Sequence, residues 1–243
     1  MARAETTGVR LTFKVRFGVI PVGRSTYTWV DRGGDVIVAK ELAPSGPVAK
    51  LYRVHDRFAA RIGGDGRPIL LYERIDEPKE RRQDRWTAVD WERGLATFLR
   101  HDFRTGEWDS RVIPAKPGLQ WPLTLSYWIL QQPIADLDGA RLPLLDGDKE
   151  KEVRLTVKGG KRVRTGLGRI EADRVEGAVW YRSRRQRYGG FTAWVRREAP
   201  RIPVRITTKL RFGSLSETVI REEPTATPPE LPPVPVDRGS GKN

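Results

Sequence analysis

Apolar and polar residues alternate along most of this chain. Residues 8–17 show the pattern clearly, because Val9, Leu11 and Phe13 fall on one side and basic residues fall between them. Turn sequences such as DRGGD at 31–35 interrupt the alternation about every 8–12 residues, the spacing of strands in an antiparallel meander. The sequence therefore predicts a mainly β protein.

The stretch WPLTLSYWILQQPI, which begins at Trp121, has a different pattern and is apolar on almost every side. Leu123, Tyr127 and Leu130 have the i, i+4, i+7 spacing of one helical face. Pro122 suits the first turn of a helix, and the second proline of the stretch cannot continue one. This stretch predicts a single helix bounded by its two prolines.

A helix this apolar must be covered on several sides, and the flanking β sequence is the candidate cover. We therefore predict an antiparallel sheet, in one or two sheet units, that covers one apolar helix near residues 122–132. The alternating pattern is lost at both ends of the chain. We expect a disordered N-terminus at 1–7, a single β-rich domain at 8–222, and a disordered or extended tail at 223–243. That tail holds six of the 18 prolines and no apolar periodicity.

Three segments within the domain are less regular. Residues 48–62 have a mixed pattern that predicts a short helical or bent entry followed by a strand. The charge run at 77–85 is expected to be a solvated hairpin tip. The most basic stretch, at 181–190, is expected to form a charge-rich hairpin arm and turn.

Composition limits the classes of partner and site. The chain has 243 residues, with 45 Lys plus Arg against 31 Asp plus Glu, so its formal net charge is +14. This balance favours anionic neighbours such as phospholipid headgroups, acidic glycans or nucleic acid. The absence of cysteine excludes disulfides, thiol catalysis and cysteine metal sites. No apolar run approaches the roughly 18 residues needed for a membrane-spanning helix.

The start of the chain indicates export. Ala2-Arg3-Ala4 has the small-x-small form of a signal-peptidase site, but no apolar leader precedes it. We therefore expect an exported protein of the periplasm or cell envelope whose signal peptide has been removed from this sequence, with an ordinary cytosolic N-terminus as the alternative.

Several segments together resemble a known family. They are the turn from Gly18 to Gly23 after the opening strand, LYRVHDRF at 51–58, LTLSYWILQQPI at 123–134, GDKEKEVRLTV at 147–157, and WVRREAPRIPVRITTKLRFGSLSETV at 194–219. They span most of the chain and resemble a family of exported bacterial proteins, the domain of unknown function three-one-zero-eight. The last segment also looks like the closing hairpin of the periplasmic lipoprotein carriers LolA and LolB.

The resemblance implies an exported, mainly β fold in which a curved antiparallel sheet or half-barrel wraps around the helix, and it implies no catalytic residues. Trp121 stands where the family usually has an Asp before the helical proline, so the usual helix cap is missing.

The sequence contains few residues that could form a catalytic or metal site. His55 and His101 each precede an aspartate, and we interpret both as strand-edge or turn residues. Asp136, Asp138, Asp146 and Asp148 are carboxylates of the kind used in glycoside chemistry or calcium binding, but their loops lack EF-hand spacing, which favours turn formation. We therefore predict no catalytic residue, no metal and no cofactor, and we do not expect an enzyme.

The leading hypothesis is a non-enzymatic envelope protein that binds a hydrophobic or lipid-like ligand in a β-sheet cleft. The apolar part of this ligand would contact the helix, with Trp121 and Trp128 lining a cavity, and its anionic headgroup would meet the arginine-rich arm. The predicted ligand-binding residues are Trp121, Leu123, Tyr127, Trp128, Leu130, Arg182, Arg184, Arg185 and Arg187.

Two other classes of function stay open. The alternative is a structural or protein-interaction module of the envelope, without a small ligand, whose proline-rich tail reaches a protein or a wall polymer. A glycan-active enzyme is less favoured. Nucleic acid is not expected as a partner, because the basic residues are scattered over every strand.

Overall fold

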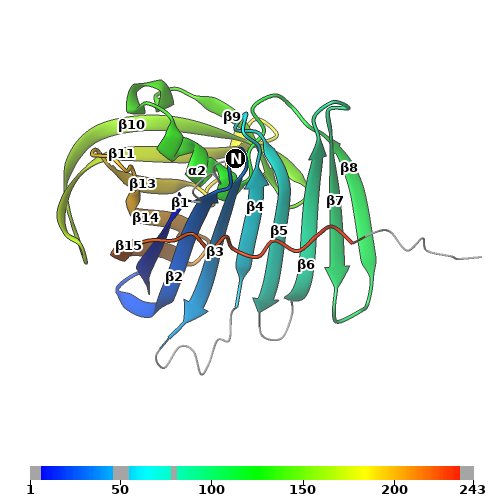
Figure 1. Cartoon of the computed structure of the whole chain (residues 1–243), viewed down its shortest axis with the longest axis horizontal. Helices are drawn as coiled ribbons and strands as arrows, with labels where there is room; N and C mark the ends of the chain where they lie inside the picture. The colour runs from blue at the N-terminus through cyan, green and yellow to red at the C-terminus, as the bar shows by residue number, and fades with distance from the viewer. Residues whose placement is uncertain (1–6, 46–54, 78–80, 236–243) are drawn as a thin grey trace, which may run out of the picture.

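One antiparallel sheet of 15 strands makes up most of the computed structural model, which describes residues 7–45, 55–77 and 81–235 (Figure 1). The first eight strands follow one another in hairpins: β1 (Thr7–Phe17), β2 (Ile20–Asp31), β3 (Val36–Pro44), β4 (Arg57–Ile62), β5 (Pro68–Glu77), β6 (Arg81–Asp90), β7 (Leu95–Asp102) and β8 (Trp108–Pro114). Gly18 and Gly94 adopt positive φ angles in two of the connecting turns. The predicted meander is confirmed.

The second half of the chain adds the helix and the remaining strands. Its elements are α2 (Pro122–Gln131), the short 3-10 helix η1 (Ile134–Leu137), β9 (Arg141–Asp146), β10 (Lys149–Thr165), β11 (Gly168–Tyr181), β12 (Arg184–Arg185), β13 (Phe191–Arg196), β14 (Pro203–Leu210) and β15 (Gly213–Pro224). The predicted helix is confirmed, and it ends before Pro133 as expected.

The strands form one continuous sheet, so of the two predicted arrangements the single sheet unit is the one observed. Their order is β8-β7-β6-β5-β4-β3-β2-β1-β15-β14-β13-β11-β10-β9, and β12 pairs with β11 outside this path. The described strands at the two ends, β8 and β9, do not pair, so the sheet is strongly curved but open. Side chains connect the two ends instead, since Arg111 and Lys116 form ion pairs with Asp148 and Glu150.

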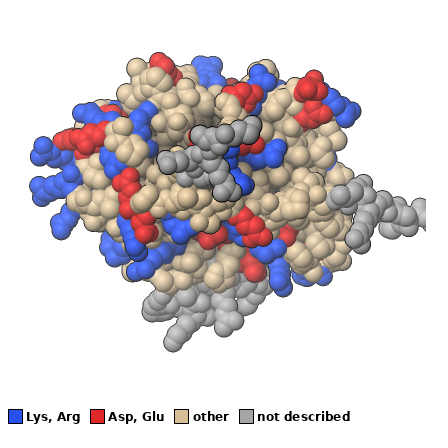
Figure 2. All heavy atoms as spheres, in the orientation of Figure 1, with Lys and Arg blue, Asp and Glu red and all other residues tan. Residues whose placement is uncertain are grey.

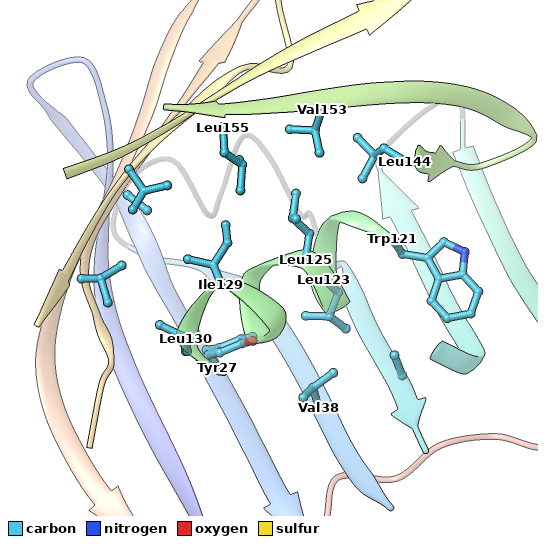
Figure 3. Close-up of a cluster of buried hydrophobic side chains, with 14 of the residues drawn as sticks. Tyr27, Val38, Trp121, Leu123, Leu125, Ile129, Leu130, Leu144, Val153 and Leu155 are labelled. Atoms are coloured by element: carbon cyan, nitrogen blue, oxygen red, sulfur yellow. The ribbon is translucent and has the colours of Figure 1, made fainter. Parts of the chain in front are cut away.

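Helix α2 lies against the concave face of this sheet. Its buried residues are Leu123, Thr124, Leu125, Ile129 and Leu130. In Figure 3 the helix lies between two walls, with Val38 and Tyr27 on one side and Leu144, Val153 and Leu155 on the other. The helix therefore joins the core between strands that are far apart in the sequence.

The start of the helix has an alternative to the missing aspartate. The hydroxyl oxygen of Thr124 accepts a hydrogen bond from the Trp121 backbone N–H at 2.9 Å. This bond satisfies one of the groups that a helix N-terminus leaves without an intrahelical partner. No helix in the described part of the chain is long and apolar enough to cross a membrane.

The structure agrees only in part with the predictions for residues 48–62 and 77–85. The helical entry expected at the start of 48–62 falls largely outside the described residues, while Arg57–Ile62 forms β4 as predicted. The charge run at 77–85 was predicted to be a solvated hairpin tip, and this was wrong for its second half. Residues from Arg81 onward form β6, and Gln83 and Asp84 are buried because β6 lies between β5 and β7.

The tail begins later than predicted, because β15 continues to Pro224. Residues 225–235 are described without regular secondary structure, in an extended course across the front of the sheet in Figure 1.

The packing of α2 generates a stability prediction. Leu125 is only 3% exposed and points toward Val153 and Leu155 (Figure 3). We expect Leu125→Ala to lower the free energy of unfolding by about 3 kcal/mol, since it removes buried methyl groups and leaves a cavity. Urea denaturation followed by tryptophan fluorescence measures the change. Gln131→Ala, at the exposed end of the same helix, is the matched control. Equal small effects for both variants would show that α2 does not fill the core.

Candidate functional site

A groove of about 960 Å³ opens at the surface near β10, β11, β13 and β14. We call it the basic groove. Its charged lining residues are Arg154, Glu176, Arg185, Arg187, Lys209 and Arg211, and its larger apolar and aromatic ones are Tyr188, Phe191 and Leu210. The groove therefore combines a strong positive charge with accessible apolar surface.

A short arm after β11 forms one side of the basic groove. Arg182 and Ser183 have φ angles of 48° and 62°, a turn geometry that reverses the chain tightly. The two-residue strand β12 then pairs back onto β11, with Arg185 opposite Trp180. Farther along, the Gly189 N–H donates a hydrogen bond to the Lys209 carbonyl oxygen at 2.9 Å. This bond ties the arm to β14 and holds its side chains beside the groove. The predicted charge-rich arm at 181–190 is thus observed.

Most cations of the basic groove have no acidic partner. Glu176 is its one acidic lining residue, and it pairs with Arg174, while Arg154 pairs with Glu152. Within residues 7–45, 55–77 and 81–235, no carboxylate forms an ion pair with any of four other lining residues: Arg185, Arg187, Lys209 and Arg211. Positive charges gathered in this way favour an anionic ligand.

The arginines predicted from the sequence divide into two groups. Arg185 and Arg187 line the basic groove, and the Arg187 guanidinium lies 5.5 Å from the centre of the Tyr188 ring. Arg182 and Arg184 are exposed on the same arm but do not line the groove, and Arg182 lies over Tyr181 instead.

The predicted helix residues are not part of this groove. Trp121, Leu123 and Leu130 are 0%, 7% and 5% exposed and belong to the apolar core, while Tyr127 and Trp128 are half-buried against it. None of the five lines the basic groove. The single site predicted from the sequence, with the helix at one end and the arginines at the other, is therefore not assembled in this structure. The helix faces the concave side of the sheet, where the walls of the core cover it.

Two residues interpreted from the sequence as structural occupy such positions. His101 stacks on Trp108 at a centroid distance of 4.3 Å and contacts Phe103. The Asp138 carboxylate accepts a hydrogen bond from the Val157 N–H at 2.8 Å and fixes a turn against β10.

A second notable group lies where β5 pairs with β6. Glu73 on β5 faces Arg85 on β6, with 4.0 Å between Glu73 Oε2 and Arg85 Nη1. The side chains are 12% and 16% exposed. Burial raises the pKa of Glu73 to about 7, with Arg85 acting in the opposite direction and the charges of Asp146 and Asp56 adding to the rise. A carboxyl group that titrates near neutral pH is thus built into the wall of the fold.

Sequence reasoning missed both Glu73 and part of the groove. Glu73 lies between Leu71 and Ile75 on the apolar side of an alternating strand, and this position was a usable signal. Lys209 and Arg211 gave no such signal, because only the pairing of β14 with β13 brings them beside the arm.

The raised pKa of Glu73 generates a pH prediction. Between about pH 4.5 and 7 the unfolded chain loses the Glu73 proton while the folded chain keeps it, so this group makes folding less favourable as the pH rises. Glu73→Gln removes that cost. We expect the free energy of unfolding of this variant, relative to the unmodified protein, to increase across this window and then to level off. The pKa difference corresponds to an increase of roughly 3 kcal/mol. This value is an upper limit, because the glutamine no longer supplies a negative charge to Arg85.

Urea denaturation at pH 5, 6, 7 and 8 measures this difference. Glu92→Gln, in the exposed turn between β6 and β7, is the control for losing one surface carboxylate. A difference for Glu73→Gln that does not change with pH would rule out a raised pKa at this position.

The structure is similar to that of a β-barrel-like protein of a domain of unknown function, DUF1849, from Brucella abortus. The two share a TM-score of 0.62 and 11% sequence identity, and the match covers 93% of this chain and 100% of that chain. At this identity the similarity concerns the fold alone. No curated protein matches the sequence. The model of a protein family of unknown function, DUF3108, matches residues 12–219, and the chain therefore belongs to this family, as the resemblance of its sequence segments predicted.

Proposed function

We propose that this protein is a non-enzymatic protein of the periplasm or cell envelope that binds an anionic amphiphile in the basic groove. The observation that carries the proposal is the gathering of Arg185, Arg187, Lys209 and Arg211 next to apolar side chains, without acidic partners among the described residues. A lipid-like ligand with a phosphate or carboxylate headgroup has the complementary chemistry.

The two parts of such a ligand have different partners in the groove. A guanidinium group binds a phosphate or carboxylate through paired, charge-assisted hydrogen bonds. Phe191, Tyr188 and Leu210 supply the apolar surface for the beginning of an acyl chain, since each Å² removed from water favours binding by roughly 25 cal/mol. The groove volume of about 960 Å³ suits a headgroup and a short length of chain.

The proposed ligand class is the one expected from the sequence, but the proposed binding site lies elsewhere in the fold. In this proposal the arm supplies Arg185 and Arg187, and the apolar contacts come from β13, β14 and the arm in place of helix α2. The location in the envelope rests on the signal-peptidase-like Ala2-Arg3-Ala4 and on the expectation from the sequence that this is an exported protein.

The burial of helix α2 favours a second candidate function. Since its apolar residues contact the walls of the sheet, the core is filled by the protein's own side chains at this point. A filled core of this kind suits a structural or interaction module of the envelope that carries no small ligand. On the face seen in Figure 2, basic and acidic side chains are interspersed, so that face presents no continuous basic area to a polyanion such as nucleic acid.

Paired arginine variants test the proposed groove. The probe is dihexanoyl phosphatidylglycerol, a soluble anionic phospholipid, titrated by calorimetry at low salt. We expect the double variant Arg185→Ala, Arg187→Ala to weaken binding by roughly tenfold or more, since each lost charge-assisted hydrogen bond costs about 1.5–3 kcal/mol. The double variant Arg182→Ala, Arg184→Ala changes the net charge equally outside the groove and is expected to bind almost normally.

Equal weakening of lipid binding by both double variants would show that net charge alone determines binding, which contradicts a specific site in the groove. Equal binding of dihexanoyl phosphatidylcholine would contradict the anionic headgroup. Mass spectrometry of an organic extract of the purified protein adds an independent reading, because a stoichiometric anionic lipid supports the amphiphile. Failure of the unmodified protein to bind the anionic probe, with an extract free of lipid, favours the interaction module.

A further inference from the structure

Strands β2–β6 carry buried apolar side chains on the face that points away from helix α2. In β5, Leu71 belongs to the core around the helix, so its neighbour Tyr72 points outward. Cross-strand pairing places Trp86 of β6 opposite Tyr72 on the same outer face. Even so, Tyr72 is only 2% and Trp86 only 6% exposed. Other buried residues of this outer face are Val30, Ile37, Ala39 and Ala59. A cover must therefore lie over it.

The described segment that crosses this outer face is residues 225–235, which we call the proline strap (Figure 1). The Thr225 N–H donates a hydrogen bond to the Gly8 carbonyl oxygen of β1 at 2.9 Å. Farther along, Arg57 of β4 donates two hydrogen bonds to Glu230, one to the carboxylate at 2.9 Å and one to the carbonyl oxygen at 2.8 Å. The strap is thus held on the sheet by specific polar contacts.

Apolar residues of the strap lie near the sheet beside these hydrogen bonds. Pro228, Pro229 and Leu231 line a hollow of about 820 Å³ together with Ile37 and Arg61 of the sheet. The strap therefore approaches the outer face with its prolines and its leucine.

The burial pattern of the strap is that of a polyproline II helix lying on a surface. In the sequence PPELPP from Pro228 to Pro233, the third and sixth residues are exposed and the other four are half-buried. This period of three matches the three residues per turn of polyproline II.

The length of the strap agrees with this conformation. Five residues separate Thr225 at β1 from Glu230 at β4, or about 15 Å at 3.1 Å per residue, and three strand spacings of about 4.8 Å give about 14 Å. Five more residues carry Pro235 to the region of β7, in agreement with Figure 1.

Strands β5–β8 carry a row of aromatic side chains on this outer face. The Tyr72 and Trp86 rings are 5.4 Å apart, and Trp86 lies 6.1 Å from Trp108, which stacks on His101 of β7. The buried indole nitrogen of Trp86 has no hydrogen-bond partner among the described residues. Aromatic rows of this kind bind proline-rich segments in other proteins.

We propose that the outer face of β3–β7 is a binding site for proline-rich peptides in the polyproline II conformation, and that the chain's own strap occupies this site. Its ligand class is defined by the strap: two proline pairs that present two of every three residues to the sheet, and an acidic residue between them for Arg57. A proline-rich segment of another protein that enters this site must displace the strap.

The first experiment measures binding of the peptide TATPPELPPVP, residues 225–235, by fluorescence polarisation. In the unmodified chain the tethered strap competes at an effective concentration in the range of about 1 mM. A strap-release variant of the full chain, carrying Pro228→Ser, Pro229→Ser, Leu231→Ser and Pro232→Ser, leaves the site open. We expect it to bind the peptide at least about tenfold more tightly than the unmodified chain does.

Matched peptides give the controls without altering the protein. We expect replacement of the peptide glutamate by lysine to weaken binding about tenfold, since it removes the carboxylate that Arg57 binds. Replacement of all five prolines by alanine should weaken it similarly by removing the preformed conformation. A strap-release variant that binds no better than the unmodified chain, or that binds all three peptides equally, overturns the proposal.

A measurement on the unmodified chain keeps the proposal testable if the strap-release variant does not fold. At several millimolar peptide, hydrogen exchange at the Thr225 amide should become faster as the strap is displaced from Gly8. Unchanged exchange at every peptide concentration overturns the proposal. These results do not depend on the basic groove, whose test uses a lipid.

Discussion

The packing of helix α2 against the concave face of the sheet is the interaction on which the rest of this structure depends. A single helix reaches strands at both sides of the fold, so the sheet must curve until β3 and β10 face each other across it. The curve brings the open edges close enough for Arg111 of β8 to pair with Asp148 in the turn before β10, and for Lys116, just after β8, to pair with Glu150 of β10. The same closure surrounds Glu73 with protein and raises its pKa.

Curving the sheet around one helix leaves its convex face to be covered separately. Along each strand, side chains alternate between the two faces, and β5 places Leu71 toward the helix and Tyr72 away from it. A strand with apolar residues on both faces needs two layers of cover. The helix supplies one layer and the proline strap supplies the other, although neither segment is large.

The elements that depend on local sequence could be predicted. Pro122 and Pro133 limit the helix, and the alternation of Val9, Leu11 and Phe13 identifies β1 and its buried face. Contacts that depend on the pairing of segments far apart in the sequence could not be predicted. The sequence does not reveal that Lys209 lies beside the arm that carries Arg185, or that Arg57 holds Glu230. Charge alone also misleads, since Asp84 in a highly charged run is buried and forms a bidentate ion pair with Arg74.

Strand β15 connects the two surfaces to which we assign binding roles. Ser214, near its start, lines the basic groove, and the proline strap follows directly after its last residue, Pro224. Between them Glu217 is only 2% exposed, and its carboxylate accepts a hydrogen bond from Ser25 at 2.5 Å and pairs with Lys40 at 2.6 Å. A buried carboxylate is costly to strip of these partners, so it fixes the middle of β15 to β2 and β3. A strand held in this way does not slide when one of its ends binds a ligand. We therefore expect the two proposed sites, the groove and the strap site, to bind their ligands independently of each other.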